Sequence, residues 1–199
     1  MSKSETTTAL RAPSFSSRFL FALNFFKSPA MLGSVIPSSR FLVSDVLNQV
    51  DWDKARVIVE YGPGVGTMTR EILKRMRPDA VLLALELNED FVAFLNDEIA
   101  DPRLHLIHAS ASEVRNVLAK LGFPSADYII SGIPYTTMRV SVRREVMQES
   151  RQVLHRDGAL IFYQFTNTVL PYLKSSFGSV RQSSQFLNIL PARIFYCTP

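Results

Sequence analysis

The sequence predicts an α/β domain in which seven strands form a mostly parallel sheet, with an antiparallel last strand and helices on both faces. From Arg56 onward, short apolar runs alternate with stretches of helical periodicity, which is typical of parallel strands joined by helices. The last two apolar runs lie too close together for a crossover connection, so they must pair antiparallel. The 199 residues, 47% of them hydrophobic, suffice for one core but not for two domains.

The chain divides near residue 50. Residues 1–50 are expected to form a polar tail and two amphipathic helices, which act as a membrane attachment or a lid over the substrate. The first helix begins near Phe15 and ends before Pro29, because the residue preceding a proline avoids the helical conformation. The second helix is expected at 39–49, and residues 51–199 form the α/β domain.

The N-terminal segment, which includes the first of these helices, is basic and rich in phenylalanine. Residues 1–44 carry five basic side chains and one acidic side chain, whereas the rest of the chain holds seventeen of each, so the net charge of +4 lies in this segment. Such a segment suits an anionic partner, either a phospholipid surface or a nucleic acid backbone. Its apolar run is far shorter than the roughly 20 residues of a membrane span, which favours a helix lying in the membrane interface.

The strands and helices of the domain follow in a regular order. Strands are expected at 57–60, 80–86, 104–108, 128–131, 159–165, 180–188 and 193–197. Helices are expected at 67–76, 89–99, 112–121 and 140–154. Seven strands with an antiparallel end are the outline of the Rossmann-like class I methyltransferase fold.

A glycine-rich loop, Glu60-Tyr61-Gly62-Pro63-Gly64-Val65-Gly66, joins the first expected strand to a helix. Glycines allow the backbone to approach a ligand, and a helix N-terminus offers free N–H groups to a carboxylate. The spacing differs from the dinucleotide fingerprint, and an acid leads the loop. We therefore expect S-adenosylmethionine as cofactor, with Glu60 near its amino group and with Tyr61, Gly62, Gly64 and Gly66 lining its site.

Two further strand ends complete the expected cofactor site. Glu86 ends the second strand, where a carboxylate can take both ribose hydroxyls, and Leu87 follows it. Ser110 and Ala111 follow the third strand, where an acid often holds the adenine amine; a serine stands there instead. The alternative is an ordinary glycine turn with Glu86 as a surface acid, but the strand context and the spacing favour cofactor binding. No residues have the spacing of a metal site.

The fourth strand ends in Ser131-Gly132-Ile133-Pro134-Tyr135, at the sheet edge where open α/β folds bind ligands. Methyltransferases acting on adenine usually carry Asn or Asp, any residue, Pro and an aromatic here. Gly132 removes the side-chain oxygen that would accept the amine hydrogens, which disfavours base methylation. Ser131, Pro134 and Tyr135 are the predicted catalytic residues, with Tyr135 orienting the amine or holding a cationic head group. The alternative is that Tyr135 packs under the cofactor.

Three arginines, Arg139, Arg143 and Arg144, follow this motif. One interpretation is that these arginines bind a lipid phosphate. The alternative, which we favour, is a solvated helix face paired with Glu145 and Glu149.

Taken together, these segments resemble the bacterial phospholipid N-methyltransferases and ornithine-lipid N-methyltransferases. The resemblance rests on residues 26–29, 33–39, 60–66, 131–134, 164–166 and 188–192. It implies transfer of a methyl group from S-adenosylmethionine to a lipid head-group amine, with S-adenosylhomocysteine as product, at the inner, cytoplasmic face of an anionic membrane. It also places Ser38 beside the methionine end of the cofactor, a role compatible with capping the helix that follows.

Three alternatives stay open. The motif Ile133-Pro134-Tyr135 and the basic N-terminus are compatible with an RNA adenine N6-methyltransferase, although Gly132 disfavours a nucleic acid substrate. A soluble amine is a second possible acceptor. The third alternative is a catalytically silent, membrane-associated module of the same fold. No protein partner is implied, and the single cysteine, Cys197, fits a reducing compartment.

Overall fold

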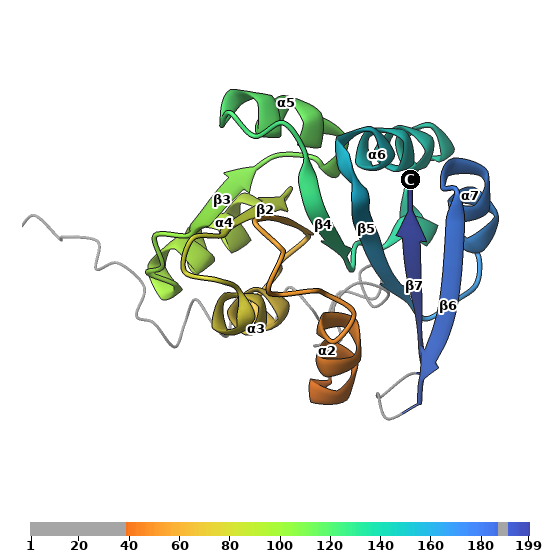
Figure 1. Ribbon diagram of the computed structural model, residues 1–199, viewed down its shortest axis with the longest axis horizontal. Coiled ribbons are helices and arrows are strands. Elements are labelled where there is room, and N and C mark those ends of the chain that lie inside the picture. The colour runs from red at the N-terminus through yellow and green to blue at the C-terminus, as the bar shows by residue number, and fades with distance from the viewer. Residues whose placement is uncertain (1–38, 187–190) are drawn as a thin grey trace, which may run out of the picture.

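The computed structural model describes residues 39–186 and 191–199 (Figure 1). The predicted N-terminal amphipathic helix, the predicted cofactor contact Ser38 and the end of the sixth predicted strand lie outside these residues. Seven strands form one sheet in the order β3-β2-β1-β4-β5-β7-β6. The strands are β1 Val57–Tyr61, β2 Val81–Glu86, β3 Leu104–His108, β4 Ala126–Ser131, β5 Leu154–Gln164, β6 Ser179–Gln185 and β7 Ala192–Thr198.

The first five strands are parallel, and β7 runs antiparallel between β5 and β6. The predicted fold class is therefore confirmed. The helices are α2 Arg40–Leu47, α3 Thr67–Arg75, α4 Glu89–Glu98, α5 Val114–Lys120, α6 Val140–Val153 and α7 Leu170–Ser176, with short 3-10 turns η2 Ala111–Glu113 and η3 Tyr135–Thr137. No described helix is long and apolar enough to cross a membrane.

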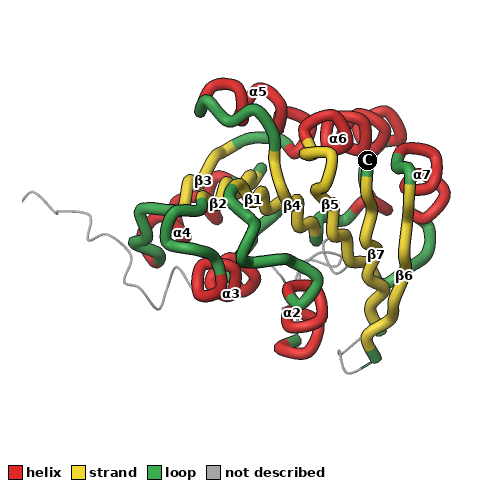
Figure 2. The backbone as a smooth tube through the Cα atoms, in the orientation of Figure 1, coloured by secondary structure: helices red, strands yellow, loops and turns green. Residues whose placement is uncertain are grey.

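Two layers of helices enclose the sheet (Figure 2). One core cluster joins the sheet to α5, α6 and α7, and a second joins it to α2 and α3. The central strands β1, β2 and β4 are almost continuously buried, as expected for strands covered on both faces. Helix α2 buries Leu42, Val43, Val46 and Leu47 in the second cluster, so it packs on the same sheet although it precedes residue 50.

Helix starts are fixed by capping side chains. The Ser39 hydroxyl accepts the N–H of Leu42 at 3.2 Å, and the Asn88 side chain accepts the N–H of Asp90 at 2.9 Å. These caps satisfy N–H groups that have no partner within a helix. They explain why α2 and α4 begin where the sequence predicted.

The structure differs from the prediction around β5 and α7. Strand β5 begins at Leu154 instead of Ala159, so it follows α6 without a loop. Residues 155–157 of this strand are polar and exposed, and a register shift against β4 between Ala126 and Tyr128 accommodates them. Helix α7 was not predicted, because seven residues give too little periodicity to recognise.

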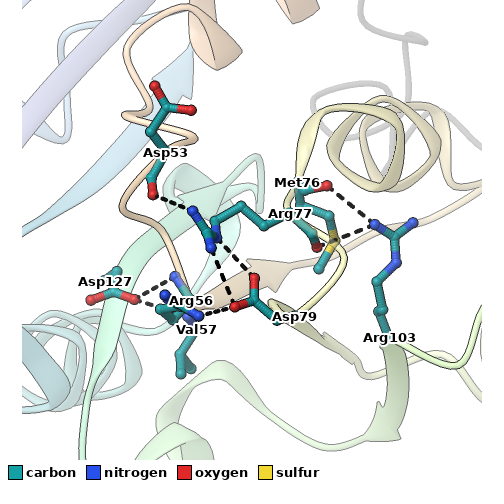
Figure 3. Close-up of polar contacts among 8 residues, drawn as sticks. All are labelled: Asp53, Arg56, Val57, Met76, Arg77, Asp79, Arg103 and Asp127. Atoms are coloured by element: carbon teal, nitrogen blue, oxygen red, sulfur yellow. Dashed lines mark hydrogen bonds and ion pairs between the residues drawn. The ribbon is translucent and has the colours of Figure 1, made fainter.

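Charged side chains tie together the amino-terminal ends of the strands (Figure 3). One Asp127 carboxylate oxygen accepts the N–H groups of Arg56 and Val57 at 2.8 and 2.9 Å. Asp79 lies between the guanidinium groups of Arg56 and Arg77, and the hydrogen bond from Arg77 lowers the pKa of Asp79. This network lies at the edge opposite the carboxyl ends of the strands, where ligands are expected.

Candidate functional site

The glycine loop turns sharply after β1. Gly62, Gly64 and Gly66 have φ values of 70°, 55° and 80°, a left-handed conformation that other residues rarely adopt. A Cβ on Gly62 would lie 2.7 Å from Cγ2 of Ile133, whereas one on Gly64 would meet no atom within 4 Å. The loop therefore packs tightly against the segment after β4 and is open at Gly64, where a ligand can approach the backbone.

Glu60, the acid that leads this loop, lies in strand β1 and is buried. Its side chain is 3% exposed, and its Oε2 atom has no hydrogen-bond partner among the described residues. Burial raises the pKa of Glu60 to about 8; the Thr69 hydroxyl opposes this rise, and the Glu86 carboxylate adds to it. A ligand's ammonium group would supply the missing partner and favour the charged carboxylate. Glu60 thus fits the predicted contact with the cofactor's amino group.

Glu86 is held by two backbone groups. Its Oε2 atom accepts the N–H of Gly64 at 3.1 Å, and its Oε1 atom accepts the N–H of Asn88 at 2.9 Å. Burial raises the pKa of Glu86, and these two bonds oppose the rise. Each oxygen keeps a second lone pair that can accept from a ribose hydroxyl. Leu87, the next residue, is 65% exposed.

Ser110 and Ala111 lie at the end of β3, as predicted, but the serine is engaged in a helix cap. Its hydroxyl accepts the N–H of Ser112 at 3.2 Å, and the Glu113 carboxylate accepts the N–H of Ser110 at 2.7 Å. This capping box places an acid beside the predicted adenine position. Glu113 has no predicted role, although the Ser-x-x-Glu pattern in the sequence indicates such a cap.

The predicted catalytic residues Ser131, Pro134 and Tyr135 surround the turn after β4. Ser131 is fully buried, and its hydroxyl has no partner among the described residues. Tyr135 is 2% exposed, and its ring contacts Phe162 edge-on with 4.6 Å between the ring centroids. The Tyr135 hydroxyl also has no hydrogen-bond partner among the described residues. Burial raises the pKa of Tyr135 well above its usual value. The tyrosine thus lies in the core under α6, and its substrate contact stays a prediction.

Tyr61 also points away from the loop opening. Its hydroxyl lies 3.1 Å from that of Ser150 on α6, and burial raises the pKa of Tyr61 beyond the normal range for tyrosine. A contact between Tyr61 and the cofactor would therefore involve its backbone.

Two residues at the end of β5 lie beside the same turn. Gln164 is 8% exposed, and its side-chain amide donates to the Ile133 carbonyl at 2.7 Å. Tyr163, the preceding residue, lies against Gly132. Neither residue has a predicted role in the site, because their position depends on the pairing of β4 with β5.

Arg143 supports the turn from α6. Its guanidinium donates to the carbonyls of Met138 and Thr136 at 2.8 and 3.0 Å. Glu149, expected to pair with the arginines after the motif, instead pairs with Arg115 at 3.0 Å. Arg143 therefore acts on the loop backbone.

Comparison with known proteins gives two kinds of relative. The family model described as ribosomal RNA adenine dimethylase matches residues 25–154. An ornithine lipid N-methyltransferase from Singulisphaera acidiphila is 29% identical over 183 residues, covering 90% of this chain and 94% of that enzyme. A ribosomal RNA small subunit methyltransferase A from Mycoplasma capricolum subsp. capricolum is 29% identical over 111 residues, covering 55% of this chain and 40% of that enzyme.

A solved structure shares the fold. Human methyltransferase-like protein 13, in complex with S-adenosylhomocysteine, matches with a TM-score of 0.60 and 15% identity, over 79% of each chain. At this identity the match concerns the arrangement of strands and helices.

Proposed function

Because the chain belongs to the ribosomal RNA adenine dimethylase family and is a class I methyltransferase that uses S-adenosylmethionine, we propose that it methylates the head-group amine of a membrane lipid. The acceptor class is phosphatidylethanolamine or ornithine lipid. The observation that carries this proposal is Gly132 directly after β4, where base-methylating enzymes place an amide or acid. Support also comes from the lipid-methylating relative, which aligns along nearly its whole length.

The cofactor supplies an electrophilic methyl group on a sulfonium. In our proposal Glu60 binds its amino group, because that carboxylate is buried and lacks a partner. Glu86, held by the N–H of Gly64, would accept hydrogen bonds from the ribose hydroxyls, and the open backbone at Gly64 would face the cofactor. Leu87, Ser110 and Ala111 border the adenine, and the predicted contact at Ser38 completes the methionine end.

The bound cofactor would supply its methyl group to the acceptor amine, with S-adenosylhomocysteine as the leaving group. The amine must be neutral to react. Because the methyl donor is already reactive, most of the catalysis consists of positioning this deprotonated amine. In our proposal Ser131, Pro134 and Tyr135 shape the turn that faces the amine. The Gln164 amide and the Arg143 guanidinium keep this turn in place by binding its carbonyl groups.

A lipid substrate requires access to a membrane surface. We propose that the predicted basic, phenylalanine-rich helix near residues 15–28 lies in an anionic bilayer interface and brings the site to the lipid. The protein would then be a peripheral enzyme of the cytoplasmic membrane face.

The test is incubation with methyl-labelled S-adenosylmethionine and, separately, anionic vesicles containing phosphatidylethanolamine, anionic vesicles containing ornithine lipid, or structured RNA. We expect label in one of the lipids. The variant Glu60→Gln serves as the control for cofactor-dependent transfer. Label found in RNA alone would contradict the proposal and support the second candidate, RNA adenine methylation, which the family match favours. Cofactor binding without label in any acceptor would support the silent module.

A further inference from the structure

The hydroxyl of Tyr163 occupies the space where a side chain at position 132 would begin. A Cβ built on Gly132 would lie 2.1 Å from the Tyr163 hydroxyl oxygen and 2.3 Å from the ring carbon that bears it. Cβ atoms do not approach other atoms this closely without displacing them. An amide or acid at position 132 therefore excludes the observed position of Tyr163, and glycine permits it.

The pairing of β4 with β5 causes this contact. Ser131 pairs with Phe162 in parallel register, so the next residues along the two strands, Gly132 and Tyr163, lie side by side. Gln164 then fixes the turn, because its amide binds the Ile133 carbonyl at 2.7 Å. The tyrosine ring and the glycine are thus held together at the carboxyl edge of the sheet.

Tyr163 shares a sheet face with Glu60. Side chains alternate along β1, and Val59 and Tyr61 belong to the core under α5, α6 and α7, so Glu60 points to the other face, near Thr69 of α3. Tyr163 packs against the core cluster on that same face. Tyr135, by contrast, is buried with Phe162 in the opposite core.

We propose that Tyr163 determines acceptor specificity: its hydroxyl oxygen accepts the hydrogen bond from the acceptor amine that an Asn or Asp accepts in base-methylating enzymes. A phenol hydroxyl can accept a hydrogen bond from an amine on a flexible chain. The face of the tyrosine ring also attracts the cationic methylated product. The same ring fills the space beside the turn that a planar base would enter. This inference rests on the proposed function, because it assumes an amine acceptor.

The test compares Tyr163→Phe with the wild-type chain on the lipid acceptor. Phenylalanine keeps the ring and removes the hydroxyl, so kcat/KM should fall roughly tenfold to thirtyfold, as expected for one lost hydrogen bond to the reacting amine. The dissociation constant of S-adenosylhomocysteine, measured by calorimetry, should stay within about twofold. Tyr172→Phe, on α7, is the matched control and should retain wild-type turnover.

A pair of thermal melts tests the steric part and needs no substrate. Gly132→Ala should lower Tm in the wild-type background, whereas Gly132→Ala added to Tyr163→Ala should lower it little further, because the clash is gone. Equal losses in both backgrounds would overturn the inference.

The outcomes separate the two proposals. Wild-type lipid methylation with an unchanged Tyr163→Phe rate would overturn the inference and leave the proposed function standing. If Tyr163→Phe loses cofactor affinity in proportion to turnover, the role of Tyr163 is structural, and this result would also overturn the inference. If the wild-type chain transfers label to RNA alone, or to no acceptor, both the inference and the proposed function would be overturned.

Discussion

The carboxylate of Glu86, at the end of β2, accepts the backbone N–H of Gly64 in the loop after β1 at 3.1 Å. Its second oxygen accepts the N–H of Asn88, the residue that caps α4. One side chain therefore sets the distance between the glycine loop and the start of α4. The proposed ribose contact is built on a carboxylate that the fold already holds in place.

Replacing Glu86 with alanine should weaken S-adenosylhomocysteine binding by roughly tenfold to a hundredfold, the range for hydrogen bonds to a charged group. Isothermal titration calorimetry measures this change. Asp157→Ala, an exposed acid in the amino-terminal part of β5 and away from the loop, is the control and should bind normally. Unchanged affinity in Glu86→Ala would refute the proposed ribose role.

The stability of the protein without cofactor should depend on Glu60. Its folded pKa of about 8 lies above the ordinary value of 4.5, so between these pH values the folded state binds more protons than the unfolded state. Glu60 therefore makes folding less favourable as pH rises from about 4.5 to about 8. Urea unfolding at several pH values should show a weaker fall in stability for Glu60→Gln than for the wild-type chain. Parallel curves would contradict this prediction.

Cofactor binding should reverse this effect. The cofactor's ammonium group favours the charged form of Glu60, so binding below pH 8 should release a proton. Calorimetry in buffers of different ionisation enthalpy measures the number of protons released. Glu60→Gln should bind more weakly and abolish the release; a variant that still releases the proton would point to another group.

Arg143→Ala should raise KM for the acceptor without changing cofactor affinity. The guanidinium holds the carbonyls of Thr136 and Met138, so its loss loosens the turn that faces the amine. We expect a change of about tenfold. Arg144→Ala, one position along the same helix, is the control. A larger effect in Arg144→Ala would instead favour a contact between this helix and lipid phosphate.

Asp127→Ala should destabilise the fold without altering the chemistry. It removes the acceptor shared by the N–H groups of Arg56 and Val57, which should cost about 1–3 kcal/mol in the free energy of unfolding. Because this network lies at the edge away from the proposed site, kcat/KM per folded molecule should not change. Asp157→Ala, an exposed acid in β5, is the stability control.

Several features of the candidate site were readable in the sequence. The loop from Glu60 to Gly66 was predictable because glycines and an acid at a strand end form a local pattern. Glu86 was predictable because it ends a recognisable apolar strand. Ser110 was placed correctly along the chain, but its part in a helix cap shows that the right position does not establish a binding role.

The alternation of strands and helices can be read from the amino-acid sequence alone, because side-chain periodicity is a local property. The antiparallel end of the sheet can be read from it too, since a short connection allows no other pairing. The start of β5 at Leu154 and the contact between Tyr163 and Gly132 were decided by the tertiary structure. Both depend on the register of β4 against β5, which includes an irregularity between Ala126 and Tyr128. Register is a relation between distant segments, so the reason for Gly132 became visible only when the two strands were paired.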